Sequence, residues 1–280
     1  MIIFANAKIN LGLKVIGKRA DGFHNIETVF YPVPFYDVLE IIHNDAFEEL
    51  ISFGFSGIEI NDAVENNLCY KAYKQLQPYI KSKKLAIHLH KKIPPGTGLG
   101  GGSSDAAFTL TGINSLLNLQ LTYQQLSDLA LDLGSDCSFF IRNKPAFATG
   151  RGEKLSPLNI DLSGRYLVIL HPGIHVSTKE AYASLGHEFS SNADQQPTDL
   201  TLNDLEKIPV EQWKDLVFND FESFVFSKFP LISDLKNALY ELGAVFALMS
   251  GSGSAVYGIF NGRPEWPDEI KKYMLMEGMM

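Results

Sequence analysis

Alternating apolar and polar residues along the first ninety residues predict mainly β-strands. Strands are expected over residues 2–16, 26–33, 38–42, 51–60 and 85–89. Pro32, Pro34 and Asp37 separate the second of these strands from the third. Lys8 and Asn10 interrupt the apolar residues of the first strand. Because alternate residues of a strand point to the same side, these two polar side chains are expected to face one way.

Apolar residues first recur at the spacing of a helix near residue 68. Leu68, Ala72, Leu76 and Tyr79 recur at the period of a helix that starts near Asn67. Further helices are expected over residues 106–117 and 122–133, the latter opened by a capping box at Thr122. The sequence Gly134-Ser135-Asp136 then breaks the helix, and short β segments are expected over residues 137–141 and 146–149.

The second half of the chain repeats this mixture. A strand is expected over residues 165–170, a loop over 190–201, helices over 204–208, 220–225 and 230–242, and strands over 245–249 and 255–260. Strands followed by helices, without regular β-α-β alternation, indicate two α+β halves. We place the boundary so that the domains comprise residues 1–157 and 158–280.

Composition narrows the class of protein. The 280 residues are 45% hydrophobic, which is enough for a sizeable core, and the formal net charge of −8 argues against nucleic acid or an anionic membrane as partner. The two cysteines are far apart, which favours a reducing compartment. Neither a signal peptide nor a membrane span is expected, because the N-terminus has no basic segment and apolar runs are short. These features predict a cytoplasmic protein.

One glycine-rich stretch lies between the strand at 85–89 and the helix at 106–117. Five of the seven residues from Gly96 to Gly102 are glycine, so this backbone can adopt positive φ angles and approach a ligand closely. Ser103, Ser104 and Asp105 follow as expected N-cap residues. A glycine loop that leads into a helix N-terminus predicts a phosphate site. A flexible linker is disfavoured, because linkers seldom join a strand to a capped helix.

Three common nucleotide-binding motifs do not fit this stretch. Gly96, Gly98 and Gly101 match G-x-G-x-x-G, but a dinucleotide fold needs a strand and an acidic residue after the helix, and here a second helix follows. The Walker lysine is missing after Gly102, and the chain contains neither HRD nor DFG. Dinucleotide folds, P-loop ATPases and protein kinases are therefore disfavoured.

The stretch PPGTGLGGGSSDAA at 94–107 instead resembles the phosphate loop of the GHMP kinases, which act on galactose, homoserine, mevalonate and phosphomevalonate. Three further blocks match that family in its order: AKINL at 7–11, GSD at 134–136 and MSGSGS at 249–254. The resemblance implies a two-domain α+β GHMP kinase fold. Its N-terminal half would be ribosomal protein S5 domain 2-like, and its C-terminal half ferredoxin-like.

Within this family, the segment KRADGFHNIET at 18–28 is similar to the 4-diphosphocytidyl-2-C-methyl-D-erythritol kinases. GSDCSFF at 134–140 and HPG at 171–173 match the same group. The resemblance implies ATP-dependent phosphorylation of a 2-hydroxyl on a cytidine diphosphate-linked substrate, in non-mevalonate isoprenoid precursor synthesis. Two residues depart from the pattern: Phe23 stands where tyrosine is common, and Thr97 replaces alanine or glycine.

The resemblance also assigns roles to residues. Asp136 would accept or orient the proton of the attacking hydroxyl, and Lys8 would offset charge on the transferring phosphoryl group. By spacing alone, Asp136 is either an ordinary cap at a turn or a catalytic carboxylate, and Lys8 is either a solvated residue of an edge strand or an inward functional charge. The residues implied in ATP binding are Pro94, Pro95, Gly96, Thr97, Gly98, Leu99, Gly100, Gly101, Gly102, Ser103, Ser104, Asn67, Leu68 and Lys91. Those implied in substrate binding are Asn10, Phe23, His24, Thr178 and Tyr182.

ATP is thus the expected co-substrate. Mg²⁺ is expected with it, and the sequence assigns no metal ligand. Two other functions stay open at this point: another small-alcohol kinase of the mevalonate or homoserine type, and a non-catalytic nucleotide-binding regulator on the same fold. The expected assembly is a monomer or a weak homodimer, without nucleic acid or membrane.

Overall fold

The computed structural model describes residues 1–60, 62–185 and 201–280. The chain forms two compact units, each assembled from several segments of the sequence. Unit 1 comprises residues 1–7, 35–95 and 100–144, and unit 2 comprises residues 8–34, 96–99 and 145–280. Within the described residues, none of the helices is long and apolar enough to cross a membrane.

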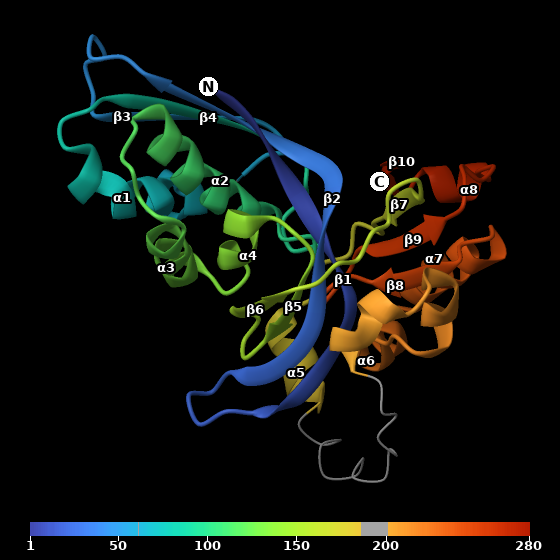
Figure 1. The fold of residues 1–280 in the computed structure, drawn as a ribbon. Helices are drawn as coiled ribbons and strands as arrows, with labels where there is room; N and C mark the ends of the chain where they lie inside the picture. Colours follow the sequence, from blue (N-terminus) through green and yellow to red (C-terminus); the bar gives the residue numbers. More distant parts are fainter. Residues whose placement is uncertain (61, 186–200) are drawn as a thin grey trace. The chain divides into compact units, whose positions relative to one another are not determined.

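Unit 1 is a small sheet with helices on one face (Figure 1). Its strands are β3 (Ile51–Gly57), β4 (Leu85–Lys91), the second half of β2 (His24–His43) and the start of β1 (Ile2–Lys18). Its helices are α1 (Leu68–Ile80), α2 (Gly101–Leu116), α3 (Tyr123–Leu133), α4 (Cys137–Arg142) and a short 3-10 helix (Val64–Asn66). β4 pairs in parallel with β3 and antiparallel with β2, so it lies in the middle.

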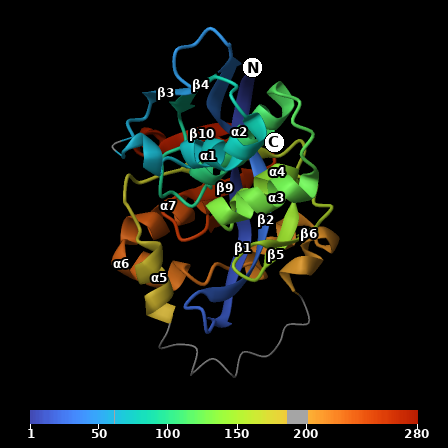
Figure 2. The ribbon, with the colours of Figure 1, turned by 90° about the vertical axis from the view of Figure 1, so that its left-hand side faces the viewer.

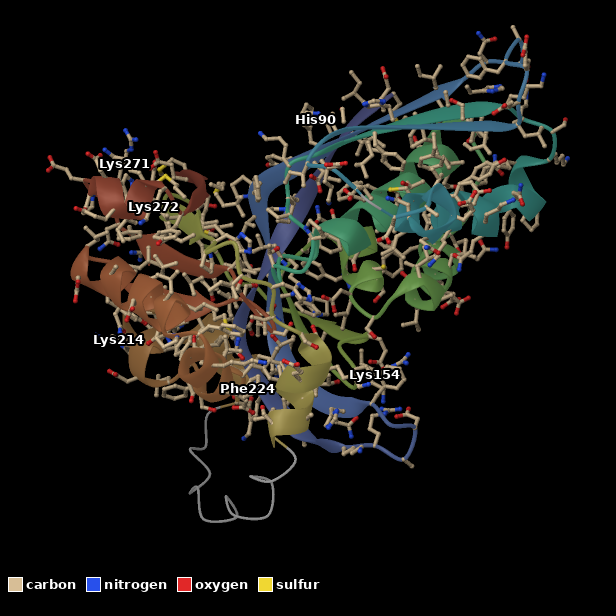
Figure 3. All side chains as sticks on the ribbon, turned by 180° about the vertical axis from the view of Figure 1, so that it is seen from behind. His90, Lys154, Lys214, Phe224, Lys271 and Lys272 are labelled. Atoms are coloured by element: carbon tan, nitrogen blue, oxygen red, sulfur yellow. The ribbon has the colours of Figure 1, made fainter. Side chains whose placement is uncertain are left out.

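The alternation along β4 decides which face the helices cover. Leu85, Ile87 and Leu89 are buried and share one core cluster with apolar residues of α1 and α2. The intervening residues include His88 and His90, and Figure 3 shows His90 on the side of the strand away from the helices. Because successive side chains of a strand point to opposite sides, the leucines and isoleucine lie on the face that the helices cover and the histidines on the other face.

Unit 2 contains a four-stranded antiparallel sheet in the order β10-β7-β9-β8. These strands are β7 (Tyr166–Leu170), β8 (Phe246–Met249), β9 (Val256–Phe260) and β10 (Met274–Met279). The helices are α5 (Thr178–Leu185), α6 (Glu222–Lys228), α7 (Pro230–Glu241) and α8 (Asp268–Lys271), with 3-10 helices at Leu202–Lys207 and Val210–Asp215. Figure 2 shows α5, α6 and α7 grouped together. Val225, Leu235 and Leu239 of α6 and α7 share a core cluster with residues of the sheet.

The first half of β2 also belongs to unit 2. It pairs antiparallel with β5 (Ala146–Thr149), which pairs in turn with β6 (Lys154–Pro157). The sequence predicted two strands on either side of Pro32 and Pro34, and this prediction is wrong, because β2 runs through both prolines. They fall between the residues paired with β5 and those paired with β4, so their missing N–H groups interrupt neither ladder.

Two other predicted elements differ from the structure. Residues 137–141 were expected as a β segment and form helix α4, because a short apolar run alone does not distinguish a buried strand from a buried helical turn. Helix α2 begins at Gly101 with Gly100 as its N-cap, so Ser103, Ser104 and Asp105 lie inside the helix instead of capping it. Most of the loop expected over 190–201 lies outside the described residues. The division into residues 1–157 and 158–280 stays a prediction.

Candidate active site

Lys8 and Asn10 are both buried in unit 2, on the same side of β1. The Lys8 ammonium donates a hydrogen bond to Asn10 Oδ1 and lies 4.8 Å from the centre of the Phe30 ring. Asn10 Nδ2 donates to Thr28 Oγ1 at 2.8 Å, and the Thr28 hydroxyl donates to the carbonyl of Gly12. Asn10 thus holds Lys8 in place. Sequence reasoning missed Thr28, whose only signal was a small polar residue within a mostly apolar strand.

The glycine motif between β8 and β9 is fixed by buried polar groups of unit 2. Asn219 Nδ2 donates to the carbonyls of Met249 and Gly251, both at 2.8 Å. Ser250 Oγ donates to the carbonyl of Gly98 at 2.9 Å, and Tyr257 donates to the carbonyl of Asn10 at 2.7 Å. This predicted motif therefore contacts the strand that carries Lys8 and part of the glycine-rich loop. The sequence did not indicate this role of Asn219, because an asparagine before a helix is usually an N-cap residue.

The glycine-rich loop has the backbone that its sequence predicts. Gly96, Gly98 and Gly100 have φ angles of 71°, 81° and 73°, which favour glycine. Gly98 is also packed tightly within unit 2, where a Cβ would lie 1.9 Å from the carbonyl oxygen of Ser250. Thr97 is buried, and its carbonyl accepts a hydrogen bond from Ala255 N–H at 3.2 Å. The departure from the family pattern at Thr97 therefore fits this fold.

The first turn of α2 is the place in unit 1 where the sequence predicts an anion to bind. Gly101, Gly102 and Ser103 are its first three residues, and N–H groups at such positions have no partner within their helix. Asn67 is the N-cap of α1, where its Oδ1 accepts the Cys69 N–H at 2.9 Å. Leu68 lies beside Gly102, 3.7 Å from where a Cβ would stand. All the predicted ATP contacts, of residues 94–104 as well as of Asn67, Leu68 and Lys91, stay predictions.

Lys91 has partners that the sequence did not indicate. Its ammonium pairs with Asp37 and, at 2.8 Å, with Asp105, and all three side chains are buried in unit 1. Burial alone would lower the pKa of Lys91, but the two carboxyl groups raise it, so the amine stays charged. Burial raises the pKa of Asp105 to about 7, while its contact with Lys91 opposes this increase. The Asp105 carboxyl group is therefore expected to gain or lose its proton near neutral pH.

Raising the pH from about 4 to about 7 is expected to lower the free energy of unfolding through Asp105. The native state holds this proton up to about pH 7, whereas the unfolded chain releases it near pH 4. Urea unfolding of wild type and Asp105→Asn should therefore differ in slope by ~1 kcal/mol per pH unit near pH 5 to 6. The exposed Asp132→Asn serves as control. Parallel slopes for wild type and Asp105→Asn would show that Asp105 stays ionised in the fold.

Asp136 lies half-buried in unit 1, directly before α4. The next residue, Cys137, is buried, and burial raises the pKa of its thiol to about 11, so it is protonated at neutral pH. A protonated, buried thiol does not act as a nucleophile. Lys8 belongs to unit 2 and Asp136 to unit 1, and their pairing stays a prediction.

The residues predicted to hold the substrate base form ring contacts within unit 2. His24 and Tyr182 are stacked, with ring centres 4.6 Å apart and planes 15° apart. Phe23 is 52% exposed and lies under the guanidinium of Arg151 at 4.6 Å. Burial, and then Lys18, lowers the pKa of His24, so its ring is neutral at pH 7. No third ring fits between His24 and Tyr182 at this spacing, so a base can enter between them only if these rings separate.

Thr178 lies at the start of α5, where its hydroxyl and that of Ser252 are hydrogen-bonded at 2.8 Å. This contact joins a predicted substrate residue to the glycine motif of unit 2. Arg151 was not predicted as a neighbour of the substrate residues, because nothing in the linear sequence relates it to them.

Two family models match the chain. Residues 67–144 match the GHMP kinases N terminal domain, and residues 202–271 match the GHMP kinases C terminal model. The chain belongs to the GHMP kinase family. The predicted family and the α+β GHMP kinase fold are thereby confirmed, and ATP is the co-substrate that a kinase of this family uses.

Similarity to individual GHMP kinases extends over nearly the whole chain. A 4-diphosphocytidyl-2-C-methyl-D-erythritol kinase of Cytophaga hutchinsonii is 48% identical over 266 residues, covering 95% of this chain and 94% of that protein. One of Bacteroides fragilis is 46% identical, covering 93% of this chain and 92% of that protein. The crystal structure of a 4-(cytidine 5'-diphospho)-2C-methyl-D-erythritol kinase matches with a TM-score of 0.74 and 32% identity, covering 92% of this chain and 90% of that one.

Proposed function

We infer that this chain transfers the γ-phosphoryl group of ATP to the 2-hydroxyl of 4-diphosphocytidyl-2-C-methyl-D-erythritol. The observation that carries this inference is the 48% identity to a kinase named for that substrate, over 95% of the chain. Two segments carry the resemblance to kinases of this kind: the glycine-rich loop at 94–104 and residues 18–28. The structure describes both segments.

We propose Asp136 and Lys8 as the catalytic residues. The substrate oxygen forms a bond to the γ-phosphorus, and the bond from that phosphorus to the β–γ bridging oxygen breaks, which releases ADP. The Asp136 carboxylate accepts or orients the proton of the hydroxyl, and the Lys8 ammonium offsets negative charge on the phosphoryl oxygens. The hydrogen bond from Lys8 to Asn10 supports this role, because it fixes the direction of the ammonium.

We propose that residues 94–104 bind the phosphates of ATP, since their backbone offers N–H groups at a helix N-terminus. Among the described residues, no three His, Cys, Asp or Glu side chains gather into a metal site. Mg²⁺ in such enzymes is held largely by substrate phosphates, so it is expected to arrive with ATP. Bound there, it would neutralise part of the phosphate charge.

We propose Phe23, His24, Thr178 and Tyr182 as the residues that bind the cytidine end of the substrate. The exposed face of Phe23 can stack on a base, and the neutral His24 ring can both donate and accept a hydrogen bond. Asn10 is expected to act through Lys8, because both ends of its side-chain amide are already hydrogen-bonded. A cytoplasmic location and a monomer or weak homodimer complete the proposal.

Measuring ATP consumption with different alcohols tests which one accepts the phosphoryl group. We expect turnover with 4-diphosphocytidyl-2-C-methyl-D-erythritol, and far lower turnover with mevalonate, homoserine or galactose at equal concentration, because only the first carries a cytidine. Phe23→Ala should raise the KM for this acceptor more than the KM for ATP, with Phe218→Ala, also exposed, as the control. Preference for another alcohol would identify a different small-alcohol kinase. ATP binding without turnover on any acceptor would identify a nucleotide-binding regulator.

A further inference from the structure

Three buried ionisable side chains join the two ends of the glycine-rich loop within unit 1. Lys91 ends β4 shortly before Pro94, Asp105 follows Ser104 in α2, and Asp37 comes from β2. The side chains of Lys91, Asp37 and Asp105 are 5%, 0% and 3% exposed. Charges so deeply buried are tolerated only when they are paired, and here each carboxyl group meets the same ammonium.

The contacts attach both ends of the loop to one point. Asp37 Oδ1 accepts the N–H groups of Lys92 and Ile93, the latter at 2.8 Å, and its Oδ2 pairs with the Lys91 ammonium. The same ammonium pairs with Asp105 Oδ2 at 2.8 Å. The start of α2 is packed against it too, since a Cβ on Gly101 would lie 2.9 Å from Lys91 Nζ.

We propose that Lys91, Asp37 and Asp105 form a charged clamp that holds residues 94–104 in the conformation that binds ATP. This inference rests on the proposed ATP site in that loop. Lys91 is then a positioning residue, because its ammonium faces two carboxyl groups in the core instead of a phosphate. A loop whose ends are fixed before binding loses less conformational entropy when the nucleotide arrives, and this strengthens binding.

The two carboxyl groups are not equivalent in the clamp. Both oxygens of Asp37 are used, so an asparagine there would direct its NH₂ group either at the Lys91 ammonium or at the backbone N–H groups. In Asp105, Oδ1 is buried and has no hydrogen-bond partner among the described residues. An asparagine in place of Asp105 can therefore keep its oxygen toward Lys91, and it leaves one positive charge beside one negative charge. Asp105→Asn should be tolerated where Asp37→Asn is not.

The first measurement is the Kd for ATP by calorimetry, without any acceptor. We expect Asp37→Asn and Lys91→Met to weaken ATP binding about 10-fold to 100-fold, since each removes hydrogen bonds to a charged group. Asp105→Asn and the control Lys92→Met, whose side chain is exposed, should bind ATP like wild type. In Asp37→Asn and Lys91→Met the loss should appear in the KM for ATP more than in kcat, because the clamp is proposed to hold the nucleotide loop and not to take part in the transfer.

Hydrogen exchange of residues 94–104 without ATP is the second measurement. Exchange should be faster in Asp37→Asn and Lys91→Met than in wild type, and unchanged in Asp105→Asn. This comparison tests the clamp even if wild type binds no ATP, which would refute the proposed function alone. Should Asp37→Asn fail to fold, Lys91→Met carries the same comparison.

Two results would overturn the clamp. If Lys91 binds a phosphate directly, Lys91→Met weakens ATP binding while Asp37→Asn does not, and exchange of the loop without ATP stays as in wild type. If the ion pairs serve stability alone, the urea midpoint falls in Asp37→Asn and Lys91→Met, while the Kd for ATP and the exchange of residues 94–104 do not change.

Discussion

Asp136→Asn is expected to lower kcat by about 10²–10⁴-fold, the usual contribution of a positioned acid–base group. Asparagine keeps the size of the side chain but does not accept a proton, so the substrate hydroxyl reaches the γ-phosphorus without help. Lys8→Ala is expected to cause a loss of similar size, because the charge on the transferring phosphoryl group is then uncompensated. Coupled detection of ADP measures both variants.

Binding and control measurements separate catalysis from folding. Both variants should bind ATP as wild type does, because neither residue belongs to the predicted nucleotide loop. Asp132→Asn and Lys14→Ala change exposed residues of the same types on α3 and β1, and they should keep full activity. Turnover near the wild-type level in Asp136→Asn would remove Asp136 from the mechanism.

Gly98→Ala is expected to destabilise the protein by about 4 kcal/mol or more, in the range of the most damaging point mutations. The new Cβ would lie 1.9 Å from the backbone oxygen of Ser250, and a backbone atom cannot move aside as a flexible side chain does. Alanine is also strained at the φ of 81° that Gly98 adopts. Urea unfolding gives the stability, and calorimetry with ATP gives the expected loss of nucleotide affinity.

Gly164→Ala is the matched control for this variant. Gly164 has the same φ of 81°, but a Cβ there would meet nothing within 4 Å. Its substitution should cost only the backbone strain, about 1–2 kcal/mol, and leave ATP binding intact. If both variants lose the same free energy of unfolding, the tight packing of Gly98 against Ser250 does not contribute to stability.

Local chemistry decided which parts of the fold were predictable. The capping box at Thr122 and the N-cap at Asn67 involve residues only a few positions apart, and both are present. β10 was missed because its sequence, MLMEGM, lacks β-branched and aromatic residues. Helix α4 was missed because the burial of its apolar residues depends on neighbours that are distant in sequence.

The same distinction holds for the candidate site. The loop at 94–104 and the polar pair Lys8 and Asn10 are visible in the sequence, since glycines in series and charges in apolar runs are unusual. Asp37, Thr28 and Asn219 carry no such signal. Each acts through a partner at least 16 positions away, as Thr28 does on Gly12, and only the folded chain reveals these pairs.

The interleaved segments of the two units have a consequence for how the protein folds. Unit 2 is complete only when residues 8–34 join residues 145–280, and β1 is tied there to late residues, as in the hydrogen bond from Leu13 N–H to the carbonyl of Phe218. Contacts between residues so distant in sequence slow folding, because a large loop must close before they form. A nascent chain therefore cannot finish unit 2 until its C-terminal strands have been synthesised.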